Sequence, residues 1–474
     1  MKILLAGYNV DTEVLADLKK TSRPRQDVTP ETLSAAYARI SRDPRPIDAL
    51  RKIAREEVEK TRKSNSTIIF KMGHHSIAEH AVFNFDILGV SRLALEEIEK
   101  FRLCAYTEKS QRYQTLEDNF LVPDEIRRTK YEGRFVKTIK LQNTCYRTLI
   151  GEGIEAEDAR YITSLATQGQ VGQTINARNL EFLFRRFASH PLAEVREIGR
   201  KMYELVAPIA PSIILFTEAN DFDQKTYSEL RTLSRFHINT MIRDPAKAGS
   251  VERGTLNVGK EIELVDYTIG ADNKLIAALM HTSTHQPYRE CLKKAKGMKI
   301  NQKKELIKTC FKHAEFYDRP LREFEFVDLT YDMVVSAACF GQLKRHRMAT
   351  LTTQPYNPAL GVTIPPAIKK SKAAKEFNRV IKETNMVYAE IARQDPLAAQ
   401  YILTNAHCRR ALMKVNAREL YHMSRLREDQ HAQWDIRNLT AAMTGRARAV
   451  MPLAMLFVGG KDRYQEIKNE SSSA

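Results

Sequence analysis

The chain has 474 residues, of which 43% are hydrophobic and 28% charged, enough for about two or three globular domains. This composition excludes a disordered chain, and no apolar run approaches the roughly 20 residues of a membrane span, so we expect no membrane partner. Six cysteines without a CxxC pair indicate neither a metal site nor a disulfide framework, which suits a cytoplasmic protein.

The net charge of +17 favours anionic partners, either nucleic acids or small phosphorylated molecules. Acidic residues are interleaved with the basic ones, however, and the chain has no RGG tract and no basic tail. The charge therefore argues for small anionic ligands, or for a solvated basic surface, more than for a nucleic-acid partner.

The first half of the chain combines a few strand patterns with several amphipathic helical patterns. In chain order, we expect a strand from residue 1, two helices within 30–63, a strand at 81–90, a helix over 91–106, a polar loop at 108–114 and a long helix at 127–150. A turn around Gly151 and Gly153 then leads to the segment NARNLEFLFRRFASHPLAEVR at 176–196.

The second half repeats this order after a weakly patterned connector. We expect a strand at 262–270, a helix at 274–281, basic helices within 289–312, a strand at 322–332, a helix over 336–347, a polar loop and a long helix at 370–392. The segment NARELYHMSRLREDQHAQWDIR follows at 416–437, and the tail after Gly460 is expected to be loose.

These two closing segments are copies of one element. Each begins Asn-Ala-Arg, carries Arg and His four residues apart, and ends acid-X-Arg, with one extra residue in the second. A repeat spaced by about half the chain indicates duplication, so we expect an α+β fold of two tandem copies, each a small, mostly antiparallel sheet with long helices. The expected parts are copy one at 1–220, a connector at 221–258, copy two at 259–462 and the tail at 463–474.

Four polar clusters are candidates for chemistry, and three of them lie outside the repeated element. GHHSIAEH at 73–80 does not have the helical spacing of an HExxH zinc motif, so we expect hydrogen-bond donors and caps rather than a metal site. EKSQRY at 108–113 is either a phosphate nest or a turn with surface charges. RHR at 345–347, preceded by Gln342, is either a grip on a polyanion or a solvated helix end.

The fourth cluster is the repeated element itself. Helical spacing predicts that Leu420, Met423 and Trp434 are core residues. Arg427 and His431 would then lie on a largely buried stripe. A buried Arg requires either a ligand or a structural partner, for which Asp435 and Glu419 are the candidates.

Together these clusters resemble the flavin-dependent thymidylate synthase family. Its signature is Arg-His-Arg, seven residues and then Ser, followed later by an Asn-x-Arg element that ends His-Ala-Gln-x-acid-Ile-Arg. HAQWDIR at 431–437 matches that end, and GHHSIAEHAVFNF at 73–85 resembles an upstream family segment. The resemblance covers almost the whole chain, twice. It implies FAD as cofactor, NADPH and methylenetetrahydrofolate as co-substrates, and dUMP as the substrate converted to dTMP.

The resemblance also implies a role for residues of both copies. Contacts to dUMP are expected from Glu108, Ser110, Gln111, Arg112, Arg160, Gln342, Arg345 and Arg427. Contacts to FAD are expected from Ser76, Glu79, Arg345, His346, Arg347, Asn416, Arg418, His422 and His431. Catalytic roles fall to Arg427 and Gln342 at the uracil ring and to Ser110 as a phosphate ligand.

The two copies depart from the family pattern in complementary ways. Copy one has KFR at 100–102 in place of the triplet but keeps Ser110, whereas copy two keeps the triplet but has Pro355 where the Ser belongs. Copy one has Arg160 where copy two has Gln400. We therefore expect composite sites that join the phosphate loop of copy one to the flavin-binding triplet of copy two.

The family builds its sites between four subunits, so we expect a homodimer of this chain that forms a pseudo-tetramer. Two alternatives remain open. One is a flavoprotein of the same fold that acts on another pyrimidine nucleotide, and the other is a non-enzymatic scaffold that binds nucleotides or RNA.

Overall fold

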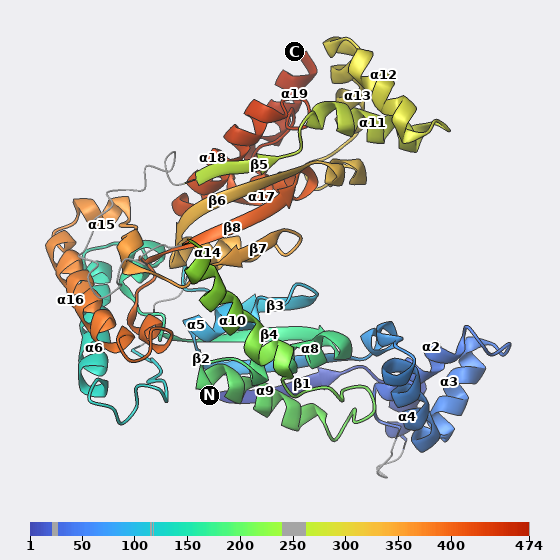
Figure 1. Ribbon diagram of the computed structural model, residues 1–474, viewed down its shortest axis with the longest axis horizontal. Helices are drawn as coiled ribbons and strands as arrows, with labels where there is room; N and C mark the ends of the chain where they lie inside the picture. Colours follow the sequence, from blue (N-terminus) through green and yellow to red (C-terminus); the bar gives the residue numbers. More distant parts are fainter. Residues whose placement is uncertain (21–26, 114–115, 117, 239–261, 474) are drawn as a thin grey trace. The chain divides into compact units, whose positions relative to one another are not determined.

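The computed structural model describes residues 1–20, 27–113, 116, 118–238 and 262–473, which form two compact units (Figure 1). Unit 1 consists of the described residues within Met1–Asn143, Ser164–Lys247 and Met386–Ile402. Unit 2 consists of those within Thr144–Thr163, Ala248–Asn385 and Leu403–Ala474. Each unit is therefore one copy that is completed by a short segment of the other copy, and we call Thr144–Thr163 and Met386–Ile402 the exchanged segments.

A four-stranded antiparallel sheet lies in each unit, with the same strand order in both. Unit 1 has the order β1 (Lys2–Tyr8), β2 (Val82–Ser91), β4 (Gln168–Asn176), β3 (Cys104–Glu108). Unit 2 has the order β5 (Ile262–Tyr267), β6 (Asp328–Ser336), β8 (Cys408–Asn416), β7 (Thr350–Thr353). The shared order confirms the predicted α+β fold of two tandem copies.

Alternating side chains on the central strands build the core. On β2, Phe83, Phe85 and Ile87 are buried, and on β6 every second residue from Leu329 to Val335 is buried. This period of two places one face of each strand against helices, which is the arrangement that removes apolar surface from water. Figure 1 shows α9 beside β1 and α18 beside β5, and these pairs are in contact.

Helices make up most of both units. The helices of copy one are α1 (Thr12–Leu18), α2 (Glu31–Arg39), α3 (Ile47–Glu56), α4 (Val58–Ser66), η1 (Thr67–Lys71), η2 (His75–His80), α5 (Arg92–Ile98), α6 (Glu132–Gly151), α7 (Ala156–Ala159), η3 (Arg160–Ile162), α8 (Ala177–Ala188) and α9 (Ala193–Val206). After α10 (Asp221–Ile238), those of copy two are α11 (Ala271–Ser283), α12 (Tyr288–Gly297), α13 (Ile300–Phe311), η5 (Arg322–Phe326), α14 (Ala337–Leu343), η6 (Pro358–Leu360), α15 (Pro366–Lys370), α16 (Ala374–Ala392), η7 (Ala398–Ile402), α17 (Ala417–Arg427), α18 (Trp434–Val450), η8 (Lys461–Arg463) and α19 (Tyr464–Ser473).

Several elements differ from those expected. The helix expected over 91–106 ends at Ile98, because Cys104 begins β3 and pairs with β4 instead. Strands β4 and β8, which precede the repeated elements, were not predicted, and β7 lies in the expected polar loop. The expected connector begins with helix α10, and its remaining residues, 239–258, lie outside the described residues.

The C-terminal tail was expected to be loose but forms helix α19 on unit 2. The Tyr464 hydroxyl donates a hydrogen bond to the Ala314 carbonyl at 2.7 Å, and Ile467 is 9% exposed. A tyrosine and an isoleucine spaced for one helix face supply the apolar contact that the tail needs to stay ordered.

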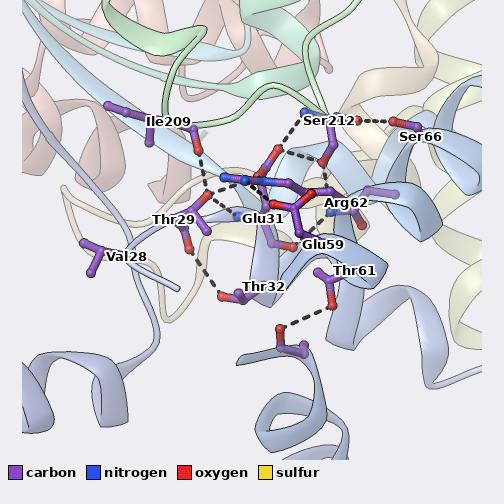
Figure 2. A network of polar contacts seen from close by, with 12 residues as sticks. Val28, Thr29, Glu31, Thr32, Glu59, Thr61, Arg62, Ser66, Ile209 and Ser212 are labelled. Carbon is purple, nitrogen blue, oxygen red and sulfur yellow. Dashed lines mark hydrogen bonds and ion pairs between the residues drawn. The ribbon is translucent and has the colours of Figure 1, made fainter. Parts of the chain in front are cut away.

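A buried carboxylate, Glu31, fixes the N-terminal helices of unit 1 to the end of copy one (Figure 2). Glu31 accepts hydrogen bonds from the amide and the hydroxyl of Ser212, both at 2.6 Å, and from Arg62 Nε at 2.7 Å. Thr29 donates its hydroxyl to the Ile209 carbonyl at 2.8 Å. A fully buried carboxylate is tolerated only with such partners, so this network is structural.

Candidate functional site

The structure divides the sequence-predicted site residues between the two units. Unit 1 holds Ser76, Glu79, Glu108, Ser110, Gln111 and Arg112. Unit 2 holds Arg160, Gln342, Arg345, His346, Arg347, Asn416, Arg418, His422, Arg427 and His431. Arg160 reaches unit 2 because it lies on an exchanged segment, so unit 2 combines predicted residues of both copies.

The triplet at 345–347 lies in the turn after α14, not on the helix that was expected to contain it. Ser336 caps that helix at its N-terminus, and the helix ends two residues before the triplet. The turn sends consecutive side chains in different directions, so His346 is 4% exposed, Arg345 is half-buried and Arg347 is exposed. Two guanidinium groups therefore flank a buried imidazole.

His346 is the centre of a small polar cluster. Arg427 Nε donates to His346 Nε2 at 3.1 Å, so Nε2 is the acceptor and the ring proton is on Nδ1, which faces Glu419 Oε1 at 3.5 Å. Burial lowers the pKa of His346 below its ordinary value, which keeps the ring neutral. The His422 ring lies edge-on to it, with centroids 5.9 Å apart. Arg427 thus contacts His346, and its NH2 group also donates to the Gln342 carbonyl at 3.5 Å.

Among the described residues, the side-chain amide of Gln342 has a hydrogen-bond acceptor for its nitrogen but no donor for its buried oxygen. The Asp435 backbone amide donates to Gln433 Oε1 at 3.1 Å, so this oxygen is an acceptor, and Gln342 must present its Nε2 to it, at 3.3 Å. Gln342 Oε1 is then buried and accepts no hydrogen bond from any described residue. Leaving such an acceptor unpaired costs about 1–3 kcal/mol, so the position suits a ligand N–H group.

A tyrosine of copy one completes this cluster. The Tyr161 hydroxyl donates to Asp435 Oδ2 at 2.8 Å and accepts from Gln433 Nε2 at 3.0 Å. Trp434 stacks on the Tyr161 ring at 6.0 Å and donates its indole N–H to Asp158 Oδ1 at 2.8 Å. These residues were missed as functional candidates, although a Tyr stands 15 residues before Asn-Ala-Arg in both copies.

Arg160 precedes this tyrosine and is 8% exposed. Its Nε donates to the Glu157 carbonyl at 3.1 Å, and its own carbonyl accepts from Asn405 Nδ2 at 3.1 Å. Burial raises the pKa of Asp435, and the hydrogen bonds from Ser336 and Tyr161 together with the Arg160 charge partly oppose that rise. A side chain of copy two, Asn405, therefore holds the backbone of Arg160 in unit 2.

The Asn-Ala-Arg start of the repeated element has local structural contacts in copy two. The Asn416 side chain accepts from the Glu419 amide at 2.9 Å and caps α17. Arg418 donates to Glu325 Oε1 at 2.8 Å and to the Pro320 carbonyl at 2.7 Å. Asn416 thus caps α17, and Arg418 connects this helix to the segment that precedes β6.

Copy one makes the same contacts. Asn176 accepts from the Asn179 amide at 3.0 Å and caps α8, and Arg178 pairs with Glu79 at 2.5 Å. Because both copies keep these contacts, the Asn-Ala-Arg identity reflects a shared fold requirement. The roles of Asn416, Arg418 and Glu79 toward FAD stay predictions.

The helical stripe expected in the second repeated element is interrupted. Leu420 and Met423 are fully buried, as predicted, but α17 ends at Arg427 and α18 begins at Trp434. His431 lies between the two helices and is exposed, so the prediction of a buried stripe was wrong for this residue. Trp434 is half-buried rather than fully buried.

In unit 1, the position of Gln342 is occupied by Glu97, which is neutralised by local partners. Glu97 lies 2.5 Å from Lys100 Nζ and 3.5 Å from His190 Nε2. Burial alone would raise the pKa of Glu97, but these two neighbours lower it to about 2. Lys100 Nζ donates to both Glu97 oxygens, so this carboxylate, unlike Gln342 Oε1, already has partners within unit 1.

At the positions of His346 and Arg427, the side chains of unit 1 also pack or pair with neighbouring residues. Phe101 replaces the imidazole and packs edge-on against Phe182 and Phe187, with centroids 5.7 and 5.8 Å apart. Arg186 pairs with Asp223 Oδ1 at 3.2 Å. The residues that differ between the copies therefore satisfy one another in unit 1.

The loop after β3 carries the predicted phosphate contacts of copy one. Ser110 Oγ accepts from the Arg112 amide at 3.1 Å, which forms a tight polar turn. Glu108 lies 3.7 Å from Arg92 NH1, and Gln111 is 9% exposed. The Arg112 guanidinium lies over the Tyr113 ring, 5.1 Å from its centroid, so the loop carries a hydroxyl and a guanidinium two residues apart, which are both groups that bind phosphate.

The histidine-rich segment at 73–80 forms helix η2, where Ser76 is exposed. His75 and His80 pack edge-on against Phe70 and Tyr37, at 6.0 and 4.6 Å between centroids. No group of three or more His, Cys, Asp or Glu among the described residues has a metal-binding arrangement. Within the same residues, no helix has the length and hydropathy of a membrane span.

A surface hollow of about 510 Å³ lies in unit 1 between α8 and α9, and includes Phe184, Arg196 and Tyr203. None of the sequence-predicted residues lines it. The polar cluster of unit 2 is therefore the better candidate site, because it combines an unpaired buried acceptor with cationic side chains.

Comparisons with known proteins relate both halves of the chain to one family. A sequence model described as "Thymidylate synthase complementing protein" matches residues 26–212 and 263–453. The flavin-dependent thymidylate synthase of Pyrococcus abyssi is 31% identical over 198 residues, covering 40% of this chain and 76% of that protein. The one from Geobacter sulfurreducens is 34% identical over 193 residues, covering 39% of this chain and 80% of that protein.

Two solved structures are also similar to parts of the chain. A UMP/dUMP methylase from Streptomyces cacaoi bound with 5-Br dUMP has 19% identity and a TM-score of 0.35, covering 45% of this chain and 92% of the other. The flavin-dependent thymidylate synthase of Helicobacter pylori complexed with FAD and dUMP has 17% identity and a TM-score of 0.34, covering 46% and 100%.

Proposed function

Because the chain belongs to the thymidylate synthase complementing protein family in two tandem copies, we propose that it is an FAD-dependent methyltransferase that converts dUMP to dTMP. One observation carries the proposal. Unit 2 joins Gln342, His346 and Arg427 of copy two in one polar cluster, whose buried acceptor matches the N–H donor of a uracil ring. In unit 1, Glu97 and Phe101 replace the first two of these groups, and the matching Arg186 pairs with Asp223 instead.

At the uracil ring, Gln342 Oε1 accepts the hydrogen bond of pyrimidine N3–H. Arg427, held by His346 Nε2 at 3.1 Å, directs its guanidinium to a ring carbonyl. A fixed cation there stabilises negative charge on the ring carbonyl, which makes C5 nucleophilic toward an electrophile. This orientation and polarisation is the catalytic contribution of the protein.

The nucleotide phosphate requires cationic and hydroxyl donors. We assign it to Arg160 and to the loop that carries Ser110 and Arg112, with Glu108 and Gln111 supporting the sugar and the loop. Arg160 already lies in unit 2, through the exchanged segment. Ser110 binds phosphate and attacks no carbon, because no described contact gives it a base.

The residues around the triplet fit FAD as cofactor. Arg345 and Arg347 offer guanidinium groups at the surface of the turn, and His422 and His431 offer exposed imidazoles, which suits a diphosphate and a flavin ring. The chemistry that FAD supplies when bound is hydride transfer from NADPH. Methylenetetrahydrofolate provides the one-carbon unit, so dUMP, NADPH, a proton and methylenetetrahydrofolate yield dTMP, NADP⁺ and tetrahydrofolate.

We further propose that the active protein is a homodimer in the cytoplasm, in which two chains supply the four copies that the family uses. The six cysteines are all unpaired, which suits a reducing compartment. Light scattering after size-exclusion chromatography measures the assembly directly. A monomeric, fully active chain contradicts the homodimer but not the reaction.

The test of the reaction is chemical. The purified chain should show a flavin absorbance spectrum and should form dTMP from dUMP, methylenetetrahydrofolate and NADPH. Gln342→Ala should lose this activity with flavin retained. A flavin-free chain that forms no product even with added FAD contradicts the proposal, and salt-dependent RNA binding by that chain would support the scaffold alternative.

A second candidate is the same chemistry on another pyrimidine nucleotide. Pro355 stands in copy two where copy one has Ser110, and Phe101 stands in copy one where copy two has His346, so both copies are altered at ligand positions. A flavin-containing chain that methylates a different pyrimidine nucleotide, and not dUMP, would favour this candidate.

A further inference from the structure

Each unit contains a clasp made of a Ser, a carboxylate and a Tyr from an exchanged segment. In unit 2, Asp435 Oδ2 accepts from Ser336 Oγ at 2.7 Å and from the Tyr161 hydroxyl at 2.8 Å. The carboxylate is the acid that ends the repeated element, and the Ser caps the helix leading to the Arg-His-Arg position. The clasp thus joins a residue of copy one to two residues of copy two.

Unit 1 repeats the clasp with the copies reversed. Glu194 Oε2 accepts from Ser91 Oγ at 2.6 Å and from the Tyr401 hydroxyl at 2.8 Å. Burial raises the pKa of both carboxylates. Because the unit without the polar cluster keeps this clasp, the clasp itself is a feature of the fold.

The two clasps differ in what they touch next. In unit 2 the Tyr161 hydroxyl also accepts from Gln433 Nε2, and the other end of that amide faces Gln342. In unit 1, Leu192 stands at the position of Gln433, and Glu97 stands at the position of Gln342. Within the described part of the chain, no side-chain amides therefore continue the hydrogen bonds beyond Tyr401. Only one of two otherwise matched tyrosines is connected to the candidate site.

We propose that Tyr161 is a positioning residue that sets the orientation of Gln342 through Gln433, and thereby the preference for a uracil over a cytosine ring. The inference rests on the proposed function. With the hydroxyl present, Gln433 Nε2 has an acceptor and its Oε1 is held for Gln342 Nε2, which leaves Gln342 Oε1 directed at the ligand. Oε1 accepts from the N3–H of uracil.

Cytosine has a lone pair at N3 in place of the N–H, so it repels an amide oxygen and pairs with an amide N–H instead. If Gln433 loses the hydroxyl, its Nε2 loses its acceptor and only the Asp435 amide still holds its Oε1. Both amides are then less firmly fixed, and Gln342 can rotate to present Nε2. Sites built around a buried hydrogen bond discriminate strongly because the wrong ligand leaves a polar group unpaired. The discrimination therefore depends on an atom of copy one that does not contact the ligand.

Tyr161→Phe and Tyr401→Phe form a matched pair, because each removes one hydroxyl from an equivalent buried carboxylate. Both should lower the thermal midpoint of the flavin-loaded chain by similar amounts. Only Tyr161→Phe should weaken dUMP binding, by about tenfold for one misplaced hydrogen bond. The ratio of dUMP to dCMP affinity, measured by calorimetric titration, should fall by a similar factor.

Gln433→Leu copies the residue of unit 1 and leaves the clasp intact, so it tests the inference even where Tyr161→Phe folds poorly. It should reproduce the loss of dUMP preference, and its midpoint should fall because it also removes the cap that Gln433 Oε1 gives the Asp435 amide. Equal dUMP affinity in the two Tyr variants, or an unchanged dUMP to dCMP ratio in Gln433→Leu, overturns the inference. A wild-type chain that binds dUMP but forms no dTMP contradicts only the proposed reaction.

Discussion

Arg427 and Arg186 occupy matching places in the two repeated elements, and we expect their removal to have opposite consequences. Arg427→Ala should abolish most of the dTMP-forming activity while the fold stays intact. Arg186→Ala should lower stability while the activity is retained. The contrast follows from their partners, since Arg427 contacts the neutral His346 and Arg186 contacts a buried carboxylate and two aromatic rings.

The magnitudes follow from these contacts. Arg186 lies 3.2 Å from Asp223 and within 5.0 and 5.5 Å of the Phe182 and Phe222 ring centroids. Its side chain is about one-third exposed, so the ion pair contributes about 0.5–1 kcal/mol and each ring contact about 0.5 kcal/mol. Asp223 keeps Arg185 at 2.8 Å, which limits the loss to about 1–2 kcal/mol.

Arg427→Ala removes the hydrogen bonds to His346 Nε2 and to the Gln342 carbonyl from a half-buried side chain, so its stability loss should be about 1–2 kcal/mol. Its kinetic loss should be larger, because removing one preorganised charge that stabilises a transition state costs about 100- to 1,000-fold in kcat. The assignment of Arg427 is tested by measuring, on both variants, the flavin content, kcat with saturating dUMP and the thermal midpoint. Comparable activity in the two variants would refute the assignment of Arg427.

Three further outcomes are expected. Since burial lowers the pKa of His346, the wild type should lose stability as the pH falls below about 6.5, and His346→Phe should remove that loss in denaturant titrations. Burial raises the pKa of Glu194, so its contribution to stability is present below about pH 4.5 and is lost as the pH rises through the raised pKa; Glu194→Gln should flatten that decline. Deleting 464–474 removes the bond from Tyr464 to Ala314 and the burial of one helix face, and should cost about 2–3 kcal/mol in the same titrations.

The duplication made much of the fold predictable, because the same order of patterns occurs twice. The strands β4 and β8 escaped prediction for different reasons. Gly169 and Gly172 weaken the strand pattern of β4, and Arg409 and Arg410 lie side by side in β8, where they read as a polar segment. Both strands are central in their sheets, so tertiary pairing outweighs local propensity.

For the site, sequence comparison between the copies separates two kinds of residue. Residues shared by both copies, such as Arg418 with its counterpart Arg178, make the same ion pair in each unit and serve the fold. Residues kept in only one copy, such as His346 and Gln342, lie in the polar cluster of unit 2. The role of Tyr161 could not be read in this way, because both copies keep the tyrosine and only its neighbours differ.

The exchanged segments also bear on how the chain folds during its synthesis. Nascent domains commonly fold as units once they have emerged from the ribosome, at roughly 5–20 residues per second. Unit 1 begins at Met1 but requires Met386–Ile402, so the partner of Glu194 arrives only after most of the polypeptide has been made. Unit 1 therefore stays incomplete until residue 402 has been translated. A ribosome that stalls before that point leaves the buried Glu194 carboxylate without the hydrogen bond from Tyr401.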